Sequence, residues 1–361
     1  MMSKKKVLVA LSGGVDSSVA ALLAKQAGYE VVAATLDMTP PDPALRAAWS
    51  CGGTAGKTIA ELTGKLGIEH RYIACYELFQ ERVLKKCFQE YASGRTPNPC
   101  CLCNPCLKFA VLLDFAKQIG AEKLLTGHYA RLTADHLIER GDDPVKDQSY
   151  FLYRLTREQL EKIEFPVGDM KKSEVRALAA AHHLPTAVTP DSQDACFRFP
   201  GEGFSETLFR IFHGETKPGD FLHENRKVGR HSGIHAFTLG QRKGLGVALG
   251  VPAYVKNINQ YTGAIELVTD VKQLERHIFQ VAELNWQSRK LPGPDETLQI
   301  QVRYRTPPVS GKVRLTSGGA AVTLDRPVRA VTPGQSAVFY RGKTMLGGGI
   351  IADHDSGEQS S

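Results

Sequence analysis

The hydrophobic pattern of the first half of the chain alternates between short apolar runs and longer amphipathic stretches. The apolar runs predict buried strands, and the amphipathic stretches predict helices. The expected strands are residues 6–11, 31–36, 70–74 and 123–126, and the expected helices are residues 16–26, 57–65, 78–91 and 107–119. Because strands alternate with helices, we expect an α/β fold with a doubly wound parallel sheet and helices on both of its faces.

The pattern changes after about residue 150, where residues 155–163 and 172–183 predict two helices with no strand between them. Beyond residue 218 the chain is rich in glycine turns, and short strands are expected at residues 298–304, 312–315 and 321–324. Short, regularly spaced strands favour a small β-barrel. We therefore expect an N-terminal sheet domain (1–205), a small central α+β domain (206–275), a C-terminal β-barrel (276–353) and a polar tail (354–361).

Composition adds two constraints to this picture. The 361 residues are 42% hydrophobic and 23% charged, as in ordinary soluble domains, and the formal net charge of +7 is compatible with a polyanionic partner. The apolar run near the N-terminus is too short to span a membrane and lacks a cleavage site, so we expect a cytoplasmic protein with no membrane partner. In a reducing cytosol, thiols rarely form structural disulfides.

A glycine-containing loop joins the first expected strand to the first expected helix, with the sequence Ser12-Gly13-Gly14-Val15-Asp16-Ser17-Ser18. Glycines let the backbone approach a ligand closely, and N–H groups at a helix N-terminus bind anions. The serine hydroxyls add donors, and Asp16 is a candidate ligand for a magnesium ion that bridges phosphates. The loop lacks the Gly-Lys-Ser/Thr ending of a Walker loop, and a plain turn capped by Asp16 or Ser17 is the alternative.

Four of the eight cysteines fall within seven residues, at Cys100, Cys101, Cys103 and Cys106. The segment is bounded by prolines, and we expect it to be a loop. Such clustering indicates metal, redox or sulfur chemistry. Cys196 follows much later in the chain. The remaining cysteines have the pattern of small hydrophobic residues, and they are Cys51, Cys75 and Cys87.

Three arrangements are open for the clustered cysteines. A zinc site would use Cys100, Cys103 and Cys106 with one further ligand. A pair of thiols would carry a persulfide on one cysteine and release its sulfur when the second cysteine forms a disulfide. Three thiolates would instead hold a 4Fe–4S cluster with one iron open to the incoming sulfur.

The glycine loop resembles the PP-loop signature of ATP pyrophosphatases. The resemblance rests on a complete Ser-Gly-Gly-Val-Asp-Ser-Ser string between a strand and a helix. Members of this superfamily cleave ATP to AMP and pyrophosphate while they adenylate an oxygen, which ammonia, an amine or sulfur then displaces. The resemblance therefore implies ATP and Mg²⁺ as cofactors, and the loop alone does not select the nucleophile.

Beyond this loop, the chain resembles tRNA-specific 2-thiouridylases over nearly its full length. The resemblance implies transfer of sulfur to carbon 2 of the wobble uridine of tRNA, with the sulfur supplied by a persulfide donor protein such as a cysteine desulfurase or sulfur relay. The matching blocks are Gly94-Arg95-Thr96-Pro97-Asn98-Pro99, Leu102-Cys103-Asn104, Thr126-Gly127-His128-Tyr129-Ala130-Arg131, Lys146-Asp147-Gln148-Ser149-Tyr150, Asp191-Ser192-Gln193-Asp194, Thr238-Leu239-Gly240-Gln241-Arg242-Lys243, Val302-Arg303-Tyr304-Arg305 and Thr332-Pro333-Gly334-Gln335.

The resemblance also implies roles for individual positions. Cys103 matches the family's nucleophile, and Cys196 matches its persulfide carrier. The ATP-binding positions are Ala10, Leu11, Ser12, Gly13, Gly14, Val15, Asp16, Ser17, Leu36 and Gly127. The positions that meet the target base are Asn98, Pro99 and Cys100. The positions that contact the rest of the tRNA are His128, Lys146, Asp147, Gln148, Tyr304, Arg305 and Gln335.

Cys100 departs from the family pattern, which usually has aspartate after Asn-Pro. The substitution creates a Cys-x-x-Cys pair with Cys103. Together with Cys196, this pair would supply the three thiolates that a 4Fe–4S cluster with one open iron requires. If the usual aspartate acts as acid or base, this chain must do without it or use the Cys100 thiolate instead.

The candidate basic contacts divide into two kinds. Arg303 and Arg305 alternate along an expected strand and would face tRNA together, and Gln241-Arg242-Lys243 is a further candidate contact with the tRNA backbone. The pairs Lys85-Lys86 and Lys171-Lys172 are typical of a solvated face. By spacing alone, His128 is better explained as a structural histidine of the core, whereas the resemblance favours a contact with tRNA.

Two other functions fit parts of the sequence. An amidating or amine-ligating PP-loop synthetase would need the ATP loop but neither Cys103 nor Cys196. A zinc-bearing RNA-binding protein would need the cysteines and the basic residues, and its nucleotide loop would be vestigial. The cysteines favour the thiouridylase over the first alternative, and the complete ATP loop favours it over the second.

Overall fold

The structure is a computed structural model that describes residues 4–48, 55–190, 197–199 and 201–353. The chain separates into two compact units. The first unit contains residues 1–82, 100–200 and 343–346. The second unit contains residues 83–99, 201–342 and 347–361.

The first unit is built on a five-stranded sheet in which every pairing is parallel, in the order β3-β2-β1-β4-β7. Its strands are β1 (Lys6–Ala10), β2 (Glu30–Asp37), β3 (Glu69–Ala74), β4 (Lys123–Leu125) and β7 (Ile163–Glu164). The doubly wound sheet expected from the sequence is confirmed. The expectation of no strand between the helices predicted at residues 155–163 and 172–183 was wrong, because the short β7 adds a fifth strand beside β4.

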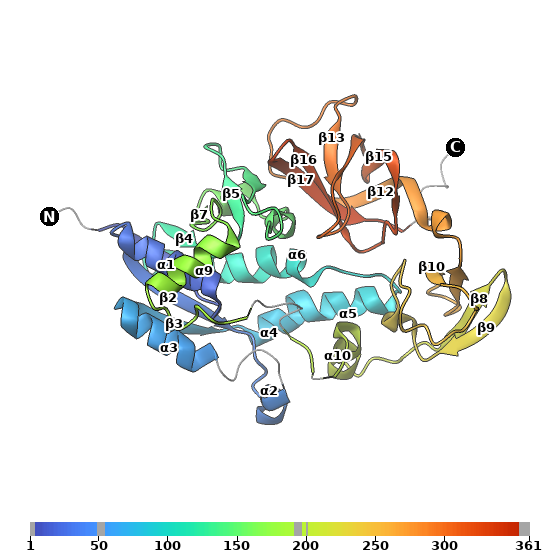
Figure 1. Cartoon of the computed structure of the whole chain (residues 1–361), viewed down its shortest axis with the longest axis horizontal. Helices are drawn as coiled ribbons and strands as arrows, with labels where there is room; N and C mark the ends of the chain where they lie inside the picture. The colour runs from blue at the N-terminus through green and yellow to red at the C-terminus, as the bar shows by residue number, and fades with distance from the viewer. Residues whose placement is uncertain (1–3, 49–54, 191–196, 200, 354–361) are drawn as a thin grey trace. The chain divides into compact units, whose positions relative to one another are not determined.

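Helices cover both faces of this sheet (Figure 1). On one face, α1 (Val15–Gln26) packs against α3 (Ala55–Leu66) and α9 (Lys172–Ala181), over Val7 and Val9 of β1. On the other face, α7 (Ala110–Gln118) packs against β1 and β4. Side chains of a strand alternate between faces, so this second face receives the fully buried Leu8 and Leu124.

The remaining elements of the first unit are short. The hairpin of β5 (Ala130–Leu132) and β6 (Ile138–Arg140) was not expected from the sequence, and Thr344 pairs with Glu139 at its edge. The short helices are α2 (Pro43–Ala48), α4 (Tyr76–Phe79), the π-helix η1 (Gln80–Leu84), the 3₁₀-helix η3 (Ser149–Leu152) and α8 (Arg157–Leu160).

The cysteine segment is helical, so the expectation of a loop was wrong. Helix α6 (Pro99–Cys103), the π-helix η2 (Asn104–Phe109) and α7 form one continuous helical stretch. Pro99 begins it, where a missing N–H costs no helical hydrogen bond, and Pro105 sits at the start of the π-helical turn. The stretch is apolar enough to cross a membrane by length and composition alone, but Leu107, Phe109 and Leu112 are buried inside the protein.

The second unit begins with helix α5 (Lys85–Ala92), which packs against α10 (Phe204–Ile211) and the 3₁₀-helix η4 (Ile234–Ala236). The rings of Phe88 and Phe209 meet edge to face at 4.9 Å. A mixed four-stranded sheet follows, in the order β10-β11-β8-β9. Its strands are β8 (Gly219–His223), β9 (Arg226–His231), β10 (Tyr254–Ile258) and β11 (Ile265–Val268).

Six strands of the second unit form the C-terminal barrel, after the 3₁₀-helix η5 (Val271–Leu274). They run in the order β12-β15-β14-β13-β16-β17, and antiparallel pairing of β12 with β17 closes the barrel. The strands are β12 (Glu275–Trp286), β13 (Leu298–Gln301), β14 (Val309–Thr316), β15 (Gly319–Arg329), β16 (Ser336–Arg341) and β17 (Thr344–Ile351). The expected barrel is therefore confirmed, although its first short strand ends at Gln301 rather than at residue 304.

Candidate functional site

The loop after β1 folds around its own serine hydroxyls. The Ser12 and Ser17 Oγ atoms lie 3.2 Å apart, and both Ser17 Oγ and Ser18 Oγ donate to the Gly14 carbonyl, at 3.0 and 2.9 Å. Gly13 has a φ of +82°, which favours glycine, and α1 begins directly after Gly14. The first N–H groups of α1 lack carbonyl partners within the helix, so the loop presents donors to an anion at this point.

Asp16, in the first turn of α1, is held by two residues from elsewhere in the first unit. The Tyr129 hydroxyl donates to its Oδ1 at 2.7 Å, and the Lys172 ammonium donates to both oxygens, at 2.7 and 2.8 Å. Lys172 begins α9, and its side chain is only 12% exposed. The expectation that Lys172 lies on a solvated face was therefore wrong, whereas its neighbour Lys171 is exposed.

Gly127 packs directly against the ATP loop. A Cβ atom at this position would lie 2.6 Å from the Asp16 carbonyl carbon and 2.6 Å from the Ser17 nitrogen. This approach places the strand-end segment after β4 against the start of α1, which agrees with the expected position of Gly127 at the nucleotide site. Leu36 lies near the end of β2, the strand between β3 and β1 in the sheet. It pairs with Ile73 of β3.

The cysteines of α6 and η2 have different surroundings. Cys100 is half-buried, whereas Cys101 and Cys103 are buried. Cys100 and Cys103 are three residues apart in one helix and therefore lie on the same face. Cys106 turns its Sγ back to the Leu102 carbonyl, 2.8 Å away.

The expected cysteine chemistry is tested only in part. Among the residues that the structure describes, no three His, Cys, Asp or Glu side chains are grouped so that they could hold a metal ion, so the zinc site of Cys100, Cys103 and Cys106 is not formed. Cys196 and Cys51 lie outside the described residues. Cys75 and Cys87 are buried, as expected of small hydrophobic residues. Burial, together with the charge of Asp37, raises the pKa of the Cys75 thiol to about 11.

A hydrogen-bonded path runs from the ATP loop to the cysteine helix within the first unit. Tyr129, which holds Asp16, receives a bond on its carbonyl from the Gln148 N–H at 2.8 Å and donates its own N–H to Gln148 Oε1 at 3.0 Å. Gln148 leads into η3, where the Phe151 carbonyl accepts from Asn104 Nδ2 at 3.2 Å. Asn104 directly follows Cys103 in the chain. The two halves of the expected chemistry therefore share one framework.

The expected tRNA-contacting stretch 146–148 serves first to build this framework. Asp147 is 9% exposed and accepts from Arg140 at 2.8 Å, from the Gly141 N–H at 3.1 Å and from the Ser149 hydroxyl at 3.0 Å. Its carboxylate is thus used inside the protein. Gln148 is bonded to Tyr129, and Lys146 is partly exposed. A contact of this stretch with tRNA stays a prediction.

His128 is packed among aromatic rings. Its ring centroid lies 5.7 Å from that of Phe109 and 6.1 Å from that of Phe165, and its Nδ1 lies 2.8 Å from Thr126 Oγ1. Burial, with a smaller contribution from the nearby Lys108 charge, lowers the pKa of His128 to about 3. The imidazole is therefore neutral at pH 7, and a contact with tRNA would use it as a neutral hydrogen-bonding group.

The arginines near residue 304 do not lie on a strand. Because β13 ends at Gln301, Arg303 and Arg305 sit in the following turn, and the expected alternation along a strand was wrong. Arg303 donates to the Thr332 hydroxyl at 3.0 Å and so serves the barrel. Arg305 is exposed, with its guanidinium 5.8 Å from the centre of the Tyr304 ring. These last two residues keep their predicted role as tRNA contacts.

The segment that leads into α6, residues 94–99, contains two of the three expected base contacts, Asn98 and Pro99, and belongs to the second unit, whereas Cys100 belongs to the first. Pro97 is buried, whereas Asn98 and Pro99 are partly exposed. Gln335, a predicted tRNA contact, donates from its side-chain Nε2 to the Thr96 carbonyl at 2.8 Å. Sequence reasoning missed this contact because the two residues are 239 positions apart.

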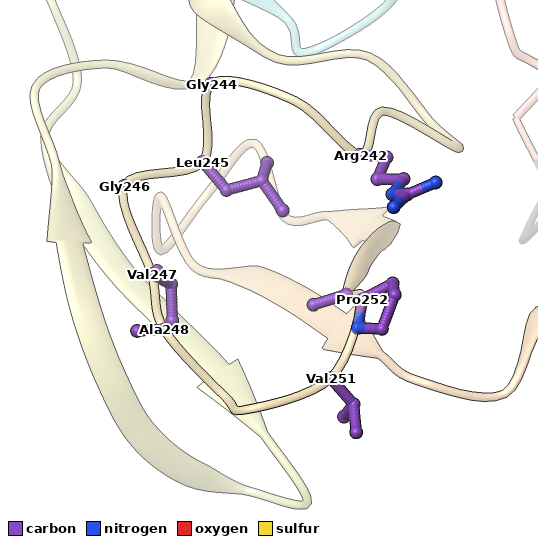
Figure 2. Close-up of a pocket in the computed structure, with 9 residues that line it drawn as sticks. Arg242, Gly244, Leu245, Gly246, Val247, Ala248, Val251 and Pro252 are labelled. Atoms are coloured by element: carbon purple, nitrogen blue, oxygen red, sulfur yellow. The ribbon is translucent and has the colours of Figure 1, made fainter.

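The expected basic loop Gln241-Arg242-Lys243 borders a surface hollow of about 360 Å³. Its walls come from one stretch of the second unit, which includes Leu245, Val247 and Pro252. In Figure 2 the Arg242 side chain lies on the same side of the hollow as Pro252, with Val247 on the other side. A contact of this loop with the tRNA backbone stays a prediction.

Three family models together match most of the chain. Residues 5–199 match a tRNA methyl transferase HUP domain, residues 211–268 a tRNA methyl transferase PRC-barrel domain, and residues 276–351 an aminomethyltransferase β-barrel domain. The parallel sheet and the serine-lined loop at the start of α1 thus define an ATP-utilising protein of the PP-loop class.

Two curated relatives identify the family within this class. The chain is 42% identical to the tRNA-specific 2-thiouridylase MnmA of Thermus thermophilus, over 96% of this chain and 95% of the relative. It is 40% identical to the tRNA-specific 2-thiouridylase MnmA of Acidithiobacillus ferrooxidans, over 97% of this chain and 99% of the relative. The chain therefore belongs to the tRNA-specific 2-thiouridylase family.

Similarity to solved structures is partial. A 4-thiouridine synthetase–RNA complex with bound ATP aligns with a TM-score of 0.36 at 16% identity, over 58% of this chain and 49% of the other. An NMN synthetase from Francisella tularensis aligns with a TM-score of 0.32 at 17% identity, over 60% of this chain and 80% of the other.

Proposed function

We propose that this protein is an ATP-dependent tRNA sulfurtransferase that converts the wobble uridine of tRNA to 2-thiouridine. The observation that carries the proposal is the framework in the first unit: a PP-loop whose Asp16 is held by Tyr129 and Lys172 is joined through Gln148 to the helix of Cys103. An amine-ligating synthetase would need this ATP loop but would have no use for Cys103. The relatives, at about 40% identity, are named for thiolation rather than for methyl transfer.

The first step is adenylation of the base. The oxygen on carbon 2 of uridine attacks the α-phosphorus of ATP, the new C–O–P link forms, and the bond between the α-phosphorus and the bridging oxygen breaks to release pyrophosphate. Charge develops on the phosphate oxygens, and preorganised N–H donors and cations stabilise it. The start of α1 and the ammonium of Lys172 are the groups we assign to this task.

The second step is sulfur transfer. We assign the persulfide to Cys196, whose outer sulfur attacks carbon 2, forms the C–S bond and displaces AMP together with the original oxygen. The Cys103 thiolate then attacks the inner sulfur of Cys196. The S–S bond breaks, its electron pair stays on the sulfur that is left on the base, and 2-thiouridine takes up a proton at N3. The disulfide formed between Cys103 and Cys196 is reduced by a cellular dithiol before the next turnover.

Asp16 does not fit a magnesium ion, whereas the cysteines fit part of a 4Fe–4S cluster site. Both oxygens of Asp16 are engaged by Lys172, so this carboxylate is a poor magnesium ligand as arranged, and we derive no step from a magnesium ion there. Magnesium would enter on the phosphate oxygens of ATP, as part of the substrate. For a 4Fe–4S cluster, Cys100 and Cys103 fit two of three ligands because they lie on one helical face, and Cys196 would be the third. When bound, the cluster would supply an open iron that holds sulfide.

The partners follow from this chemistry. The substrate is a tRNA with uridine at the wobble position, which must leave the anticodon stack at a cost of about a few kcal/mol. Sulfur reaches Cys196 from a persulfide-bearing donor protein, and the reaction takes place in the cytoplasm, where tRNA is available.

The proposal is tested by mass spectrometry of tRNA nucleosides from a strain that lacks this protein and has no second copy of the gene. We expect 2-thiouridine derivatives to disappear, and to return when the wild-type chain is supplied. Complementation by the Cys103→Ser variant, or 2-thiouridine that persists in the deletion strain, would contradict it.

A further inference from the structure

The segment that is expected to meet the target base, residues 94–99, is held at one residue from three directions. The Thr96 N–H donates to the Pro333 carbonyl at 3.0 Å, and the Thr96 carbonyl accepts from Gln335 Nε2 at 2.8 Å. The Thr96 hydroxyl donates to Thr238 Oγ1 at 3.0 Å. All four residues belong to the second unit, so these contacts lie within one compact body. Both backbone polar groups and the side chain of Thr96 are thus occupied.

The barrel turn that makes two of these contacts, Thr332 to Gln335, is itself firmly anchored. The Gly334 N–H donates to the Ile351 carbonyl at 3.0 Å, and the Ile351 N–H donates to the Gln335 carbonyl at 2.8 Å. Thr332 is 1% exposed and receives the Arg303 guanidinium on its hydroxyl. A buried turn tied to the closing strand of a barrel has little freedom, so it can fix the position of what is bonded to it.

The packing between the turn and the segment leaves no room for a side chain. A Cβ atom on Gly334 would lie 3.0 Å from the Thr96 nitrogen and 3.1 Å from its carbonyl carbon, and Gly334 has a φ of +87°. At the start of the segment, Gly94 also has a positive φ, of +72°, and a Cβ there would lie 2.8 Å from Ile258 Cγ2. Glycine is therefore required at both positions by conformation and by space.

We propose that the barrel turn Thr332–Gln335 positions residues 94–99, the segment expected to meet the target base, through Thr96, so that Gln335 acts as a positioning residue for adenylation. This inference rests on the proposed function. It assigns to the barrel a part in the chemical step, in addition to any part it has in binding the body of the tRNA.

The geometry of the segment explains why the contacts between the barrel turn and Thr96 matter. Thr96 is followed by Pro97, which is buried, and then by the partly exposed Asn98 and Pro99. Pro97, whose φ is fixed, is the only residue between Thr96 and Asn98, and Pro99 restricts the backbone of Asn98 from the other side. A displacement of about 1 Å of a positioning group reduces a rate by about 100-fold. Loss of the contacts to Thr96 should therefore slow the reaction of bound tRNA more than it weakens binding.

The Gln335→Glu variant tests this directly, because glutamate has the same shape but cannot donate to the Thr96 carbonyl. We expect the single-turnover rate of AMP formation at saturating tRNA to fall by about 10- to 100-fold, while the Kd for tRNA changes by less than about twofold. A tRNA ligand would behave in the opposite way, since a new negative charge would raise the Kd and leave the rate at saturation unchanged. That result would overturn the proposal.

A second variant keeps the test decisive if Gln335→Glu folds poorly. Gln335→Met removes the donor to the Thr96 carbonyl without adding a charge. We expect it to lower the single-turnover rate as Gln335→Glu does, with a Kd for tRNA within about twofold of the wild type. A wild-type rate for Gln335→Met would contradict the positioning role.

The wild-type protein, measured in the same assay, separates this inference from the proposed function. If the wild type forms 2-thiouridine and these variants match it, only the positioning role fails. If the wild type forms neither AMP nor 2-thiouridine with ATP, tRNA and a persulfide donor, the proposed function fails, and the positioning role with it.

Discussion

The ATP loop and residues 94–99, the segment expected to meet the target base, are held by contacts of different range along the chain. In the ATP loop, the hydroxyls of Ser12, Ser17 and Ser18 bond to groups no more than five residues away. Within residues 94–99, Thr96 bonds to residues that lie 142 and 239 positions further along. The first element is close to self-sufficient, whereas the second depends on the folding of the barrel.

This difference separates a local motif from a tertiary one. A loop that is stabilised by its own serines does not depend on distant parts of the chain. It can therefore be recognised from a short sequence, residues 12–18. A segment that is braced by a distant turn has no comparable signature, because Thr96, Thr238 and Gln335 are ordinary residues until the chain has folded.

The largest effect should follow from removing the thiol of Cys103. We expect Cys103→Ser to lower formation of 2-thiouridine by at least about 1,000-fold, the scale on which loss of a nucleophile acts, while release of pyrophosphate in the presence of tRNA continues. The control is Cys106→Ser, because the Cys106 thiol contacts backbone carbonyls, those of Leu102 and Arg82, and a serine hydroxyl can also donate to them. Equal activity of the two variants would remove Cys103 from the mechanism.

The next largest effect concerns Lys172, which with Tyr129 provides the long-range bonds to Asp16 of the otherwise local ATP loop. Lys172→Met removes the ammonium that bonds both oxygens of Asp16, and we expect pyrophosphate release to fall by about 100- to 1,000-fold. The matched control is Lys171→Met, at the adjacent exposed position. If both variants release pyrophosphate at the wild-type rate, the ATP loop needs no support from α9.

The close approach of Gly127 to the ATP loop should appear in stability. Gly127→Ala places a Cβ 2.6 Å from backbone atoms of Asp16 and Ser17, and we expect the free energy of unfolding to fall by about 1–3 kcal/mol. Gly64→Ala, in the open interior of α3, should instead raise it by up to about 1 kcal/mol. Urea denaturation of both variants measures the difference, and equal shifts would refute the packing argument.

The smallest effect is the pH dependence that His128 contributes. Its pKa of about 3 in the folded state lies below the ordinary value, so the unfolded chain binds a proton first as the pH falls below about 6.5. Between pH 7.5 and 5 the wild type should therefore lose about 1–2 kcal/mol more stability than His128→Gln. Urea denaturation at both pH values tests this, and parallel losses would mean that His128 is not buried as a neutral group.

Sequence patterns anticipated those features that depend on near neighbours in the chain. Alternation of apolar runs and amphipathic stretches predicted the parallel sheet, and glycine-punctuated short strands predicted the barrel. The position of the ATP loop at the start of α1 followed from the turn of a strand into a helix. In each case the physical cause lies within about ten residues.

Two of the features that were missed depend on distant partners, and a third depends on where prolines fall within a helix. Lys172 was predicted to lie on a solvated face with Lys171. Its partner Asp16 is 156 residues away, so local sequence spacing does not reveal the bond. The cysteine segment looked like a loop because of its prolines, yet Pro99 begins a helix and Pro105 falls at a π-helical turn, where the missing N–H is tolerated. Arg303 looked like a phosphate contact but serves Thr332.

The most direct test of adenylation follows the oxygen of the base. An anticodon stem-loop RNA that carries ¹⁸O on carbon 2 of its wobble uridine is incubated with the protein, ATP and a persulfide donor, and the AMP is analysed by mass spectrometry. Our account predicts one ¹⁸O atom in AMP for each 2-thiouridine formed, because the adenylated oxygen leaves with the phosphate. Unlabelled AMP alongside newly formed 2-thiouridine would contradict it.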